Sequence, residues 1–172
     1  MQMILKRIQT TVGTVTGTNC YIVMDELTHE SIVVDPGAEI EAVINMLMTI
    51  DSKLKYIVLT HCHGDHISGV NRLKEVYGGK VLIHKDDEEG LRDGEINLAS
   101  YINLGEVTVE ADSRLNDGDT IHIGNLKFKV IHTPGHTKGG LCLYCEEEKM
   151  LFSGDTMFRG SWGRIDLPTR KL

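Results

Sequence analysis

Residues 60–66 read Thr-His-Cys-His-Gly-Asp-His, and this stretch constrains the fold of the chain more than any other. It places His61, His63, Asp65 and His66 directly after the apolar run 55–59, which predicts a buried β-strand. Imidazole nitrogens and carboxylate oxygens together favour zinc, with iron or manganese as alternatives. We therefore expect the fold to bring this strand end into a site for a divalent metal, and a solvated polar turn is the less favoured interpretation.

The remaining patterns indicate a layered α/β domain. Strand patterns occur at 3–9, 20–24, 31–34, 55–59, 80–83, 120–123, 126–131, 140–145 and 150–152. Apolar residues at helical spacing predict two helices, one from Ile40 to Leu47 and one from Val70 to Tyr77. The acidic segment 85–119 has weak periodicity, and we expect a partly helical surface excursion or a lid. Helices between the early strands and strands alone afterwards suggest stacked sheets with helices outside, in a single domain of residues 1–172.

Charge and hydropathy exclude some classes of partner. The formal net charge is −7 and no basic patch is evident, which argues against a nucleic-acid-binding protein. No apolar run approaches the roughly 18–20 residues of a membrane span, and the N-terminus lacks the layout of a secretory signal. We expect a cytoplasmic protein that acts on a small molecule. The cysteine pair Cys142 and Cys145 lies in a strand pattern and is interpreted as buried apolar residues rather than as a redox pair.

Two further strand ends carry chemically active side chains. His132-Thr133-Pro134-Gly135-His136-Thr137 follows one strand pattern, and Ser153-Gly154-Asp155-Thr156 follows another. Strand-end loops are where a scaffold displays functional side chains. These two segments and the turn at 60–66 are therefore expected to converge on one pocket.

In this order, the three segments resemble the motifs of the metallo-β-lactamase superfamily. Together with Asp35-Pro36-Gly37 and the run 154–161, they are most similar to its glyoxalase II-like branch, the hydroxyacylglutathione hydrolases. The resemblance covers essentially the whole chain. It implies a four-layer αββα sandwich with up to two metal ions, zinc by preference, at one edge between the sheets.

The resemblance also implies roles for individual residues. The implied ligands are His61, His63 and His136 for a first metal, Asp65 and His66 for a second, and Asp155 as a bridge between the two. A metal-bound hydroxide would be the nucleophile, and Asp65 would also act in catalysis by orienting it. Asp35 and His132 are candidate partners of the ligand rings, although Asp35 could equally be a turn residue and His132 a pocket wall.

The chain departs from the family pattern near its C-terminus. The family carries one more histidine there, as a ligand of the second metal, but none of the 17 residues after Asp155 is histidine. We therefore expect a truncated chain that lacks the closing strand and helix and has an incomplete second metal site. An uncovered sheet edge would favour oligomer formation.

Three functions are compatible with these observations. The leading one is a metal-dependent hydrolase, a glyoxalase II-like thioesterase whose substrate is a small-molecule thioester. The alternatives are a mononuclear iron persulfide dioxygenase of the same fold and a weakly active or inert metal-binding domain. Nuclease members of the superfamily are disfavoured by the negative net charge.

Overall fold

The N-terminal strand patterns form one mixed sheet. In the computed structural model, which describes residues 3–167, this sheet has the order β1-β2-β3-β4-β5-β6. Its strands are β1 Met3–Val12, β2 Val15–Asp25, β3 Glu30–Val34, β4 Lys53–Val58, β5 Lys80–His84 and β6 Ser113–Leu115. The first three strands are antiparallel, and β3 to β6 run parallel. Neighbouring parallel strands are usually joined through a helix, and here α1 Ile40–Thr49 lies between β3 and β4 in the chain, while α2 Gly64–Ile67 and α3 Val70–Tyr77 lie between β4 and β5.

The C-terminal strand patterns form a second, antiparallel sheet with the order β10-β9-β8-β7. Its strands are β7 Thr120–Ile123, β8 Leu126–His132, β9 Leu141–Cys145 and β10 Met150–Phe152, and a separate hairpin follows, β11 Met157–Phe158 with β12 Ser161–Trp162. In β8 the apolar side chains Leu126, Phe128 and Val130 are buried while Lys127 and Lys129 are exposed, as the alternation predicts.

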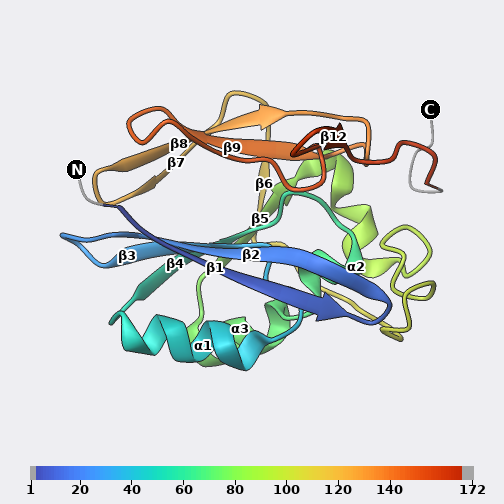
Figure 1. Ribbon diagram of the computed structural model, residues 1–172, viewed down its shortest axis with the longest axis horizontal. Coiled ribbons are helices and arrows are strands. Elements are labelled where there is room, and N and C mark those ends of the chain that lie inside the picture. Colours follow the sequence, from blue (N-terminus) through green and yellow to red (C-terminus); the bar gives the residue numbers. More distant parts are fainter. Residues whose placement is uncertain (1–2, 168–172) are drawn as a thin grey trace.

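The layers follow from where the apolar side chains lie. One buried cluster, which includes Val23, Val58 and Phe128, fills the space between the two sheets. A second cluster joins the outer face of the first sheet to the helices α1 Ile40–Thr49 and α3 Val70–Tyr77. Figure 1 shows these three layers, with the helices below and the second sheet above. Within residues 3–167 no α-helix contributes to the cluster between the sheets.

The expected layered α/β fold is thus confirmed, with three of the four αββα layers formed by the described residues. Both predicted helices are present, with nearly the predicted bounds. The segment 85–119 contains two short 3-10 helices, η1 Lys85–Asp87 and η2 Glu89–Arg92, as the expectation of partial helix suggested. It also contains β6, which the sequence did not predict because three residues carry too little periodicity.

Two surface features bear on the remaining expectations. β10 is an edge strand with the exposed apolar side chain Leu151, and the hairpin that follows it exposes Met157, Phe158 and Trp162. Self-association through this edge stays a prediction. No helix among residues 3–167 has the length and hydropathy needed to cross a membrane.

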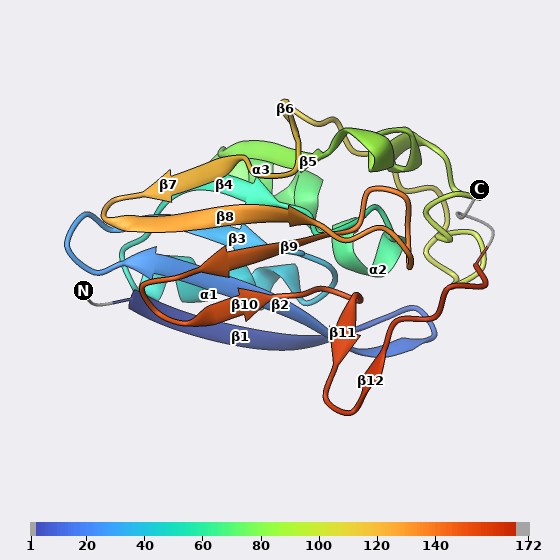
Figure 2. The ribbon, with the colours of Figure 1, turned by 90° about the horizontal axis from the view of Figure 1, so that it is seen from above.

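The topology places the functional segments together. β8 and β10 are both antiparallel to β9, so their carboxyl ends point the same way. Figure 2 shows these two strands running toward the end of the sandwich where the short helix α2 Gly64–Ile67 lies, and α2 follows β4 of the first sheet. One edge of the sandwich therefore receives three strand ends, each followed by a histidine or an aspartate.

Candidate metal centre

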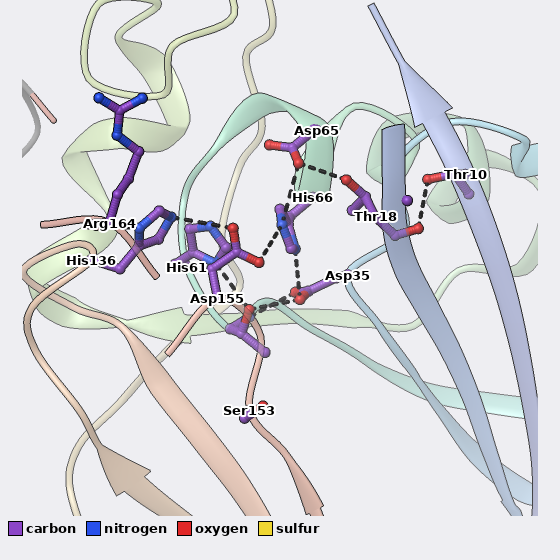
Figure 3. A network of polar contacts seen from close by, with 12 residues as sticks. Thr10, Thr18, Asp35, His61, Asp65, His66, His136, Ser153, Asp155 and Arg164 are labelled. Carbon is purple, nitrogen blue, oxygen red and sulfur yellow. Dashed lines mark hydrogen bonds and ion pairs between the residues drawn. The ribbon is translucent and has the colours of Figure 1, made fainter. Parts of the chain in front are cut away.

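The turn after β4 is entirely buried, although it is rich in polar residues. His61, His63, Asp65 and His66 are each at most 8% exposed. Polar groups are buried at little cost only when each has a partner. The solvated-turn interpretation is therefore wrong, and the partners of these side chains define the site (Figure 3).

Three histidines from two sheets form a tight cluster. His61, His63 and His136 each offer a ring nitrogen, and these atoms all lie within 4.8 Å of one another. The ring centroids of His61 and His136 are 5.0 Å apart, and those of His63 and His136 are 4.6 Å apart. The rings meet nearly edge to face, so their nitrogens converge rather than stack.

The tautomer of His61 is set by Thr60 and Asp35. The Thr60 hydroxyl donates to Asp35 Oδ2 at 2.6 Å, because a carboxylate can only accept. Its oxygen must then accept from His61 Nδ1, 3.0 Å away. The remaining ring nitrogen, His61 Nε2, carries a lone pair, is buried and has no hydrogen-bond partner in the described part of the chain.

His136 is oriented in a similar way. Its Nδ1 lies 2.8 Å from the carbonyl oxygen of Arg164 and donates to it. His136 Nε2 is also buried without a hydrogen-bond partner among residues 3–167, and it lies 3.3 Å from Asp155 Oδ2. Two buried lone pairs aimed at one point carry a desolvation cost that a bound cation would remove. The residues present therefore fit a divalent metal at this position.

Asp35 holds the whole turn as well as the rings. It accepts hydrogen bonds from the Thr60 amide at 2.8 Å and from His66 Nδ1 at 2.9 Å, in addition to the Thr60 hydroxyl. Its backbone has φ of +53°, a conformation that aspartate tolerates better than most residues. Asp35 is thus both a turn residue and a partner of two histidine rings, so the two interpretations from the sequence are compatible.

Three carboxylates surround His66. Besides Asp35 at its Nδ1, its Nε2 lies 3.4 Å from Asp65 Oδ2 and 3.3 Å from Asp155 Oδ1. Although burial lowers the pKa of His66, the charges of Asp35 and Asp65 outweigh it and raise the pKa well above its ordinary value. The ring of His61 lies beside it, with the two centroids 4.2 Å apart, so the second group of ligands adjoins the first.

Asp155 spans the two groups of histidines. One of its oxygens faces His136 and the other faces His66, at 3.3 Å each. Burial raises its pKa, but the neighbouring His136 and His66 rings outweigh burial and hold the pKa far below the ordinary range. Its carboxylate therefore stays ionised with one oxygen for each side, the arrangement that a bridging ligand requires.

Electrostatics also keep two rings of the first cluster, those of His61 and His63, unprotonated. Burial, followed by the neighbouring histidines, lowers the pKa of His61 well below its ordinary value. Burial and then His136 and His66 lower the pKa of His63 to about 3. Neutral imidazoles are the form that binds a metal.

Sequence reasoning missed Asp87, which connects the two turns that carry the cluster. Its Oδ2 accepts from the Cys62 amide at 3.0 Å and from the Thr137 hydroxyl at 2.7 Å, and its Oδ1 accepts from the Gly139 amide at 2.5 Å. Asp87 is only 3% exposed, whereas Asp86 and Glu89 beside it are exposed. In the sequence it is one acidic residue in an acidic run, so no local signal distinguishes it.

Thr18 of β2 was missed for a comparable reason. Its hydroxyl donates to Asp65 Oδ2 at 2.7 Å across 47 positions of sequence. This bond fixes the Asp65 carboxylate between the first sheet and the histidine cluster, as Figure 3 shows.

The structure places His132 away from the cluster. Its ring stacks on His84 with centroids 3.9 Å apart, and its Nε2 lies 2.9 Å from the carbonyl oxygen of Lys138. The expected contact with a ligand ring is not among the hydrogen bonds of His132 in the described residues. Cys62 points away from the cluster as expected, with its sulfur against Gly90.

Comparison with known proteins agrees with this geometry. The family model described as "Metallo-beta-lactamase superfamily" matches residues 13–172. The chain belongs to the metallo-beta-lactamase superfamily. Its solved relatives of the same fold include BLEG-1, described as a B3 metallo-beta-lactamase, with a TM-score of 0.86 and 33% identity over 96% of this chain and 78% of that one. TTHA1623 in a di-iron-bound form has a TM-score of 0.78 and 31% identity over 94% of this chain and 78% of that one.

Two curated relatives of this superfamily member have more specific names. Hydroxyacylglutathione hydrolase GloC of Haemophilus influenzae is 30% identical over 87% of this chain and 71% of its own length. A protein of Bacillus subtilis named "Probable polyketide biosynthesis zinc-dependent hydrolase PksB" is 33% identical over 84% of this chain. The chain spans only 57% of the length of the latter.

Proposed function

We propose that this metallo-beta-lactamase superfamily chain is a metal-dependent thioester hydrolase of the glyoxalase II-like type. The observation that carries the proposal is the pair of buried, unpartnered Nε2 atoms of His61 and His136. In this proposal, His61, His63, His136 and Asp155 hold the first metal, and Asp65 and His66 share Asp155 for a second.

A bound divalent metal lowers the pKa of water from 15.7 to about 7 and polarises a carbonyl oxygen. The protein supplies the orientation. Thr60 and the Arg164 carbonyl hold two ligand rings with their lone pairs inward. Thr18 occupies Oδ2 of Asp65, so we assign Oδ1 of Asp65 to accept a proton from the attacking water and to orient its oxygen.

Zinc is the proposed metal, with iron as the alternative. The nitrogen and oxygen donor set suits zinc, and one relative is named as a zinc-dependent hydrolase. A structural relative is described in a di-iron-bound form, so the donor set alone does not fix the metal. The second set has only Asp65, His66 and Asp155 in the described residues, and we expect it to bind metal more weakly than the first.

The test is elemental analysis followed by assay. Purified protein is loaded with zinc, iron or manganese, and hydrolysis of S-lactoylglutathione, of other thioesters and of a β-lactam is followed. We expect thioester hydrolysis that is lost with a chelator and restored by zinc. If no thioester is cleaved with any metal, the proposal is wrong.

A mononuclear iron persulfide dioxygenase is the second candidate, because His61, His136 and Asp155 alone offer two histidines and one carboxylate to a single ion. Iron near one equivalent together with oxygen uptake on glutathione persulfide would favour it. If the protein binds metal but shows neither activity, it is an inert metal-binding domain.

A further inference from the structure

A cleft opens directly onto the metal-binding cluster, and part of its lining is apolar. The cleft has a volume of about 360 Å³, and its lining includes His63, Asp65, His136 and Asp155 of the cluster. Its apolar lining residues, here called the apolar wall, are Val15, Leu98, Tyr101, Ile102 and Leu167. The proposed chemistry of the metal site gives these five residues no role.

The wall is fixed to the metal-binding turn by Asn97. The Gly64 amide donates to the Asn97 carbonyl at 2.7 Å, and the Asn97 side chain accepts from the Ala99 amide and donates to the Val107 carbonyl. Thr14, next to Val15, donates its amide to the Ile102 carbonyl. These bonds anchor the backbone that carries Leu98, Tyr101 and Ile102 to the turn of the cluster, so the wall is formed without a ligand.

Beyond the proposed metals, the side chains that line the cleft offer little to the anionic groups of a ligand. Arg164 is the cation among the described residues that line it, and its guanidinium is bound by both oxygens of Asp166, at 2.7 and 2.8 Å. The other charged side chains of the lining are the carboxylates of Asp65 and Asp155. Glutathione carries two carboxylates and one ammonium group, and each carboxylate needs a cation or several donors when it leaves water.

We infer that the substrate is a thioester of an apolar acyl chain and an uncharged thiol, with the chain lying on Leu98, Tyr101 and Ile102. The inference rests on the proposed thioesterase function and narrows it. In the reaction, the oxygen of water bonds to the acyl carbon, the carbon–sulfur bond breaks, and a water proton passes to the sulfur. The products are a carboxylic acid and a neutral thiol.

The experiment is a chain-length series on the zinc-loaded protein. The substrates are the acetyl, butyryl and hexanoyl thioesters of N-acetylcysteamine, compared with S-lactoylglutathione. Burial of each methylene on the wall predicts that kcat/KM rises by about three- to fourfold per methylene. We expect hexanoyl-N-acetylcysteamine to exceed S-lactoylglutathione in kcat/KM.

Two variants test where the chain lies. Ile102→Ser makes the wall polar at a half-buried position and should lower kcat/KM for the hexanoyl substrate more than for the acetyl substrate. Leu27→Ser is the matched control, because Leu27 is 78% exposed in the turn after β2 and lines no part of the cleft. Circular dichroism and thermal unfolding verify that both variants are folded.

The outcomes separate the two proposals. A preference for S-lactoylglutathione, or a flat chain-length series, overturns the inference and leaves the thioesterase function standing. If no thioester is cleaved, the proposed function fails. Calorimetry with two inert thioethers then tests the binding preference on which the inference depends, for an apolar chain joined to an uncharged thiol. S-hexyl-N-acetylcysteamine should bind at least tenfold more tightly than S-hexylglutathione, and equal or absent binding of the two would overturn it.

Discussion

The hydroxyl of Thr60 is predicted to control metal binding without touching the metal. It donates to Asp35 and accepts from His61 Nδ1, so it keeps the proton of His61 away from the nitrogen that faces the cluster. Thr60→Val replaces the hydroxyl with a methyl group of similar shape. His61 is then left with a buried N–H that has no acceptor, and its proton can move to Nε2, where it blocks coordination.

The size of the effect follows from the two hydrogen bonds that Thr60→Val removes. A hydrogen bond to a charged group contributes about 1.5–3 kcal/mol, and a buried donor left unsatisfied costs about 1–3 kcal/mol. Because these costs overlap, we expect the free energy of unfolding of Thr60→Val to fall by about 2–4 kcal/mol. Loss of a partner of a ligand histidine typically weakens metal affinity by about 10–100-fold, and we expect the same range here.

Two measurements check this prediction. Zinc affinity is measured by competition with a chromophoric chelator, and stability is measured by urea unfolding with the metal removed. Thr60→Ser keeps the hydroxyl and should bind zinc nearly as well as the original protein. Thr10→Val is the matched control, since Thr10 is also buried but its hydroxyl bonds the Thr18 carbonyl. The reasoning is refuted if Thr60→Val binds zinc within threefold of the unmodified chain.

Three further predictions follow from the same structure. Asp87→Asn should weaken zinc binding by about tenfold, measured by chelator competition, because an amide cannot accept from all three donors and one turn of the cluster is released. Gly154→Ala should lower the free energy of unfolding by about 2–4 kcal/mol, measured by urea unfolding, since φ is +49° and an added Cβ would overlap the Thr60 hydroxyl. Burial raises the pKa of Asp25, but backbone hydrogen bonds from Asn125 and the β2–β3 turn lower it overall. Its stabilisation is present above the unfolded pKa of about 3.9 and is lost as pH falls through the lower folded pKa, so Asp25→Asn should flatten the acid limb of stability against pH. An unchanged acid limb would contradict this assignment.

The local patterns of the sequence were sufficient for most of the fold. Strict alternation predicted β8, and helical spacing predicted α1 and α3, because each period leaves one face apolar. β6 and α2 were not predicted because a segment of three or four residues has no measurable period. The conformation of segment 85–119 could not be predicted since it depends on side chains such as Asn97, whose partners lie up to ten residues away or across the fold.

The residues of the site likewise divide into those that local motifs predicted and those that only distant contacts define. The residues that converge, His61, His63, His136 and Asp155, were predicted from motifs at strand ends, and the structure brings them together. Thr18 and Asp87 were not predicted, since each acts through contacts 25 to 52 positions away in sequence. Whether these residues bind metal stays a prediction that the chelator titrations test.

The sequence by itself predicted the candidate metal-binding motif at 60–66, the layered fold and the family, because each follows from short motifs and local periodic patterns that can be recognised along the chain. Only the tertiary structure decided which nitrogens of His61 and His136 face the cluster, and that an apolar wall lines the cleft beside it. The physical reason is that hydrogen-bond partners and cleft walls come from segments that meet only after folding. The motif predicts the type of site, whereas the fold sets the tautomers of its histidines, the charges around them and the shape of the adjoining cleft.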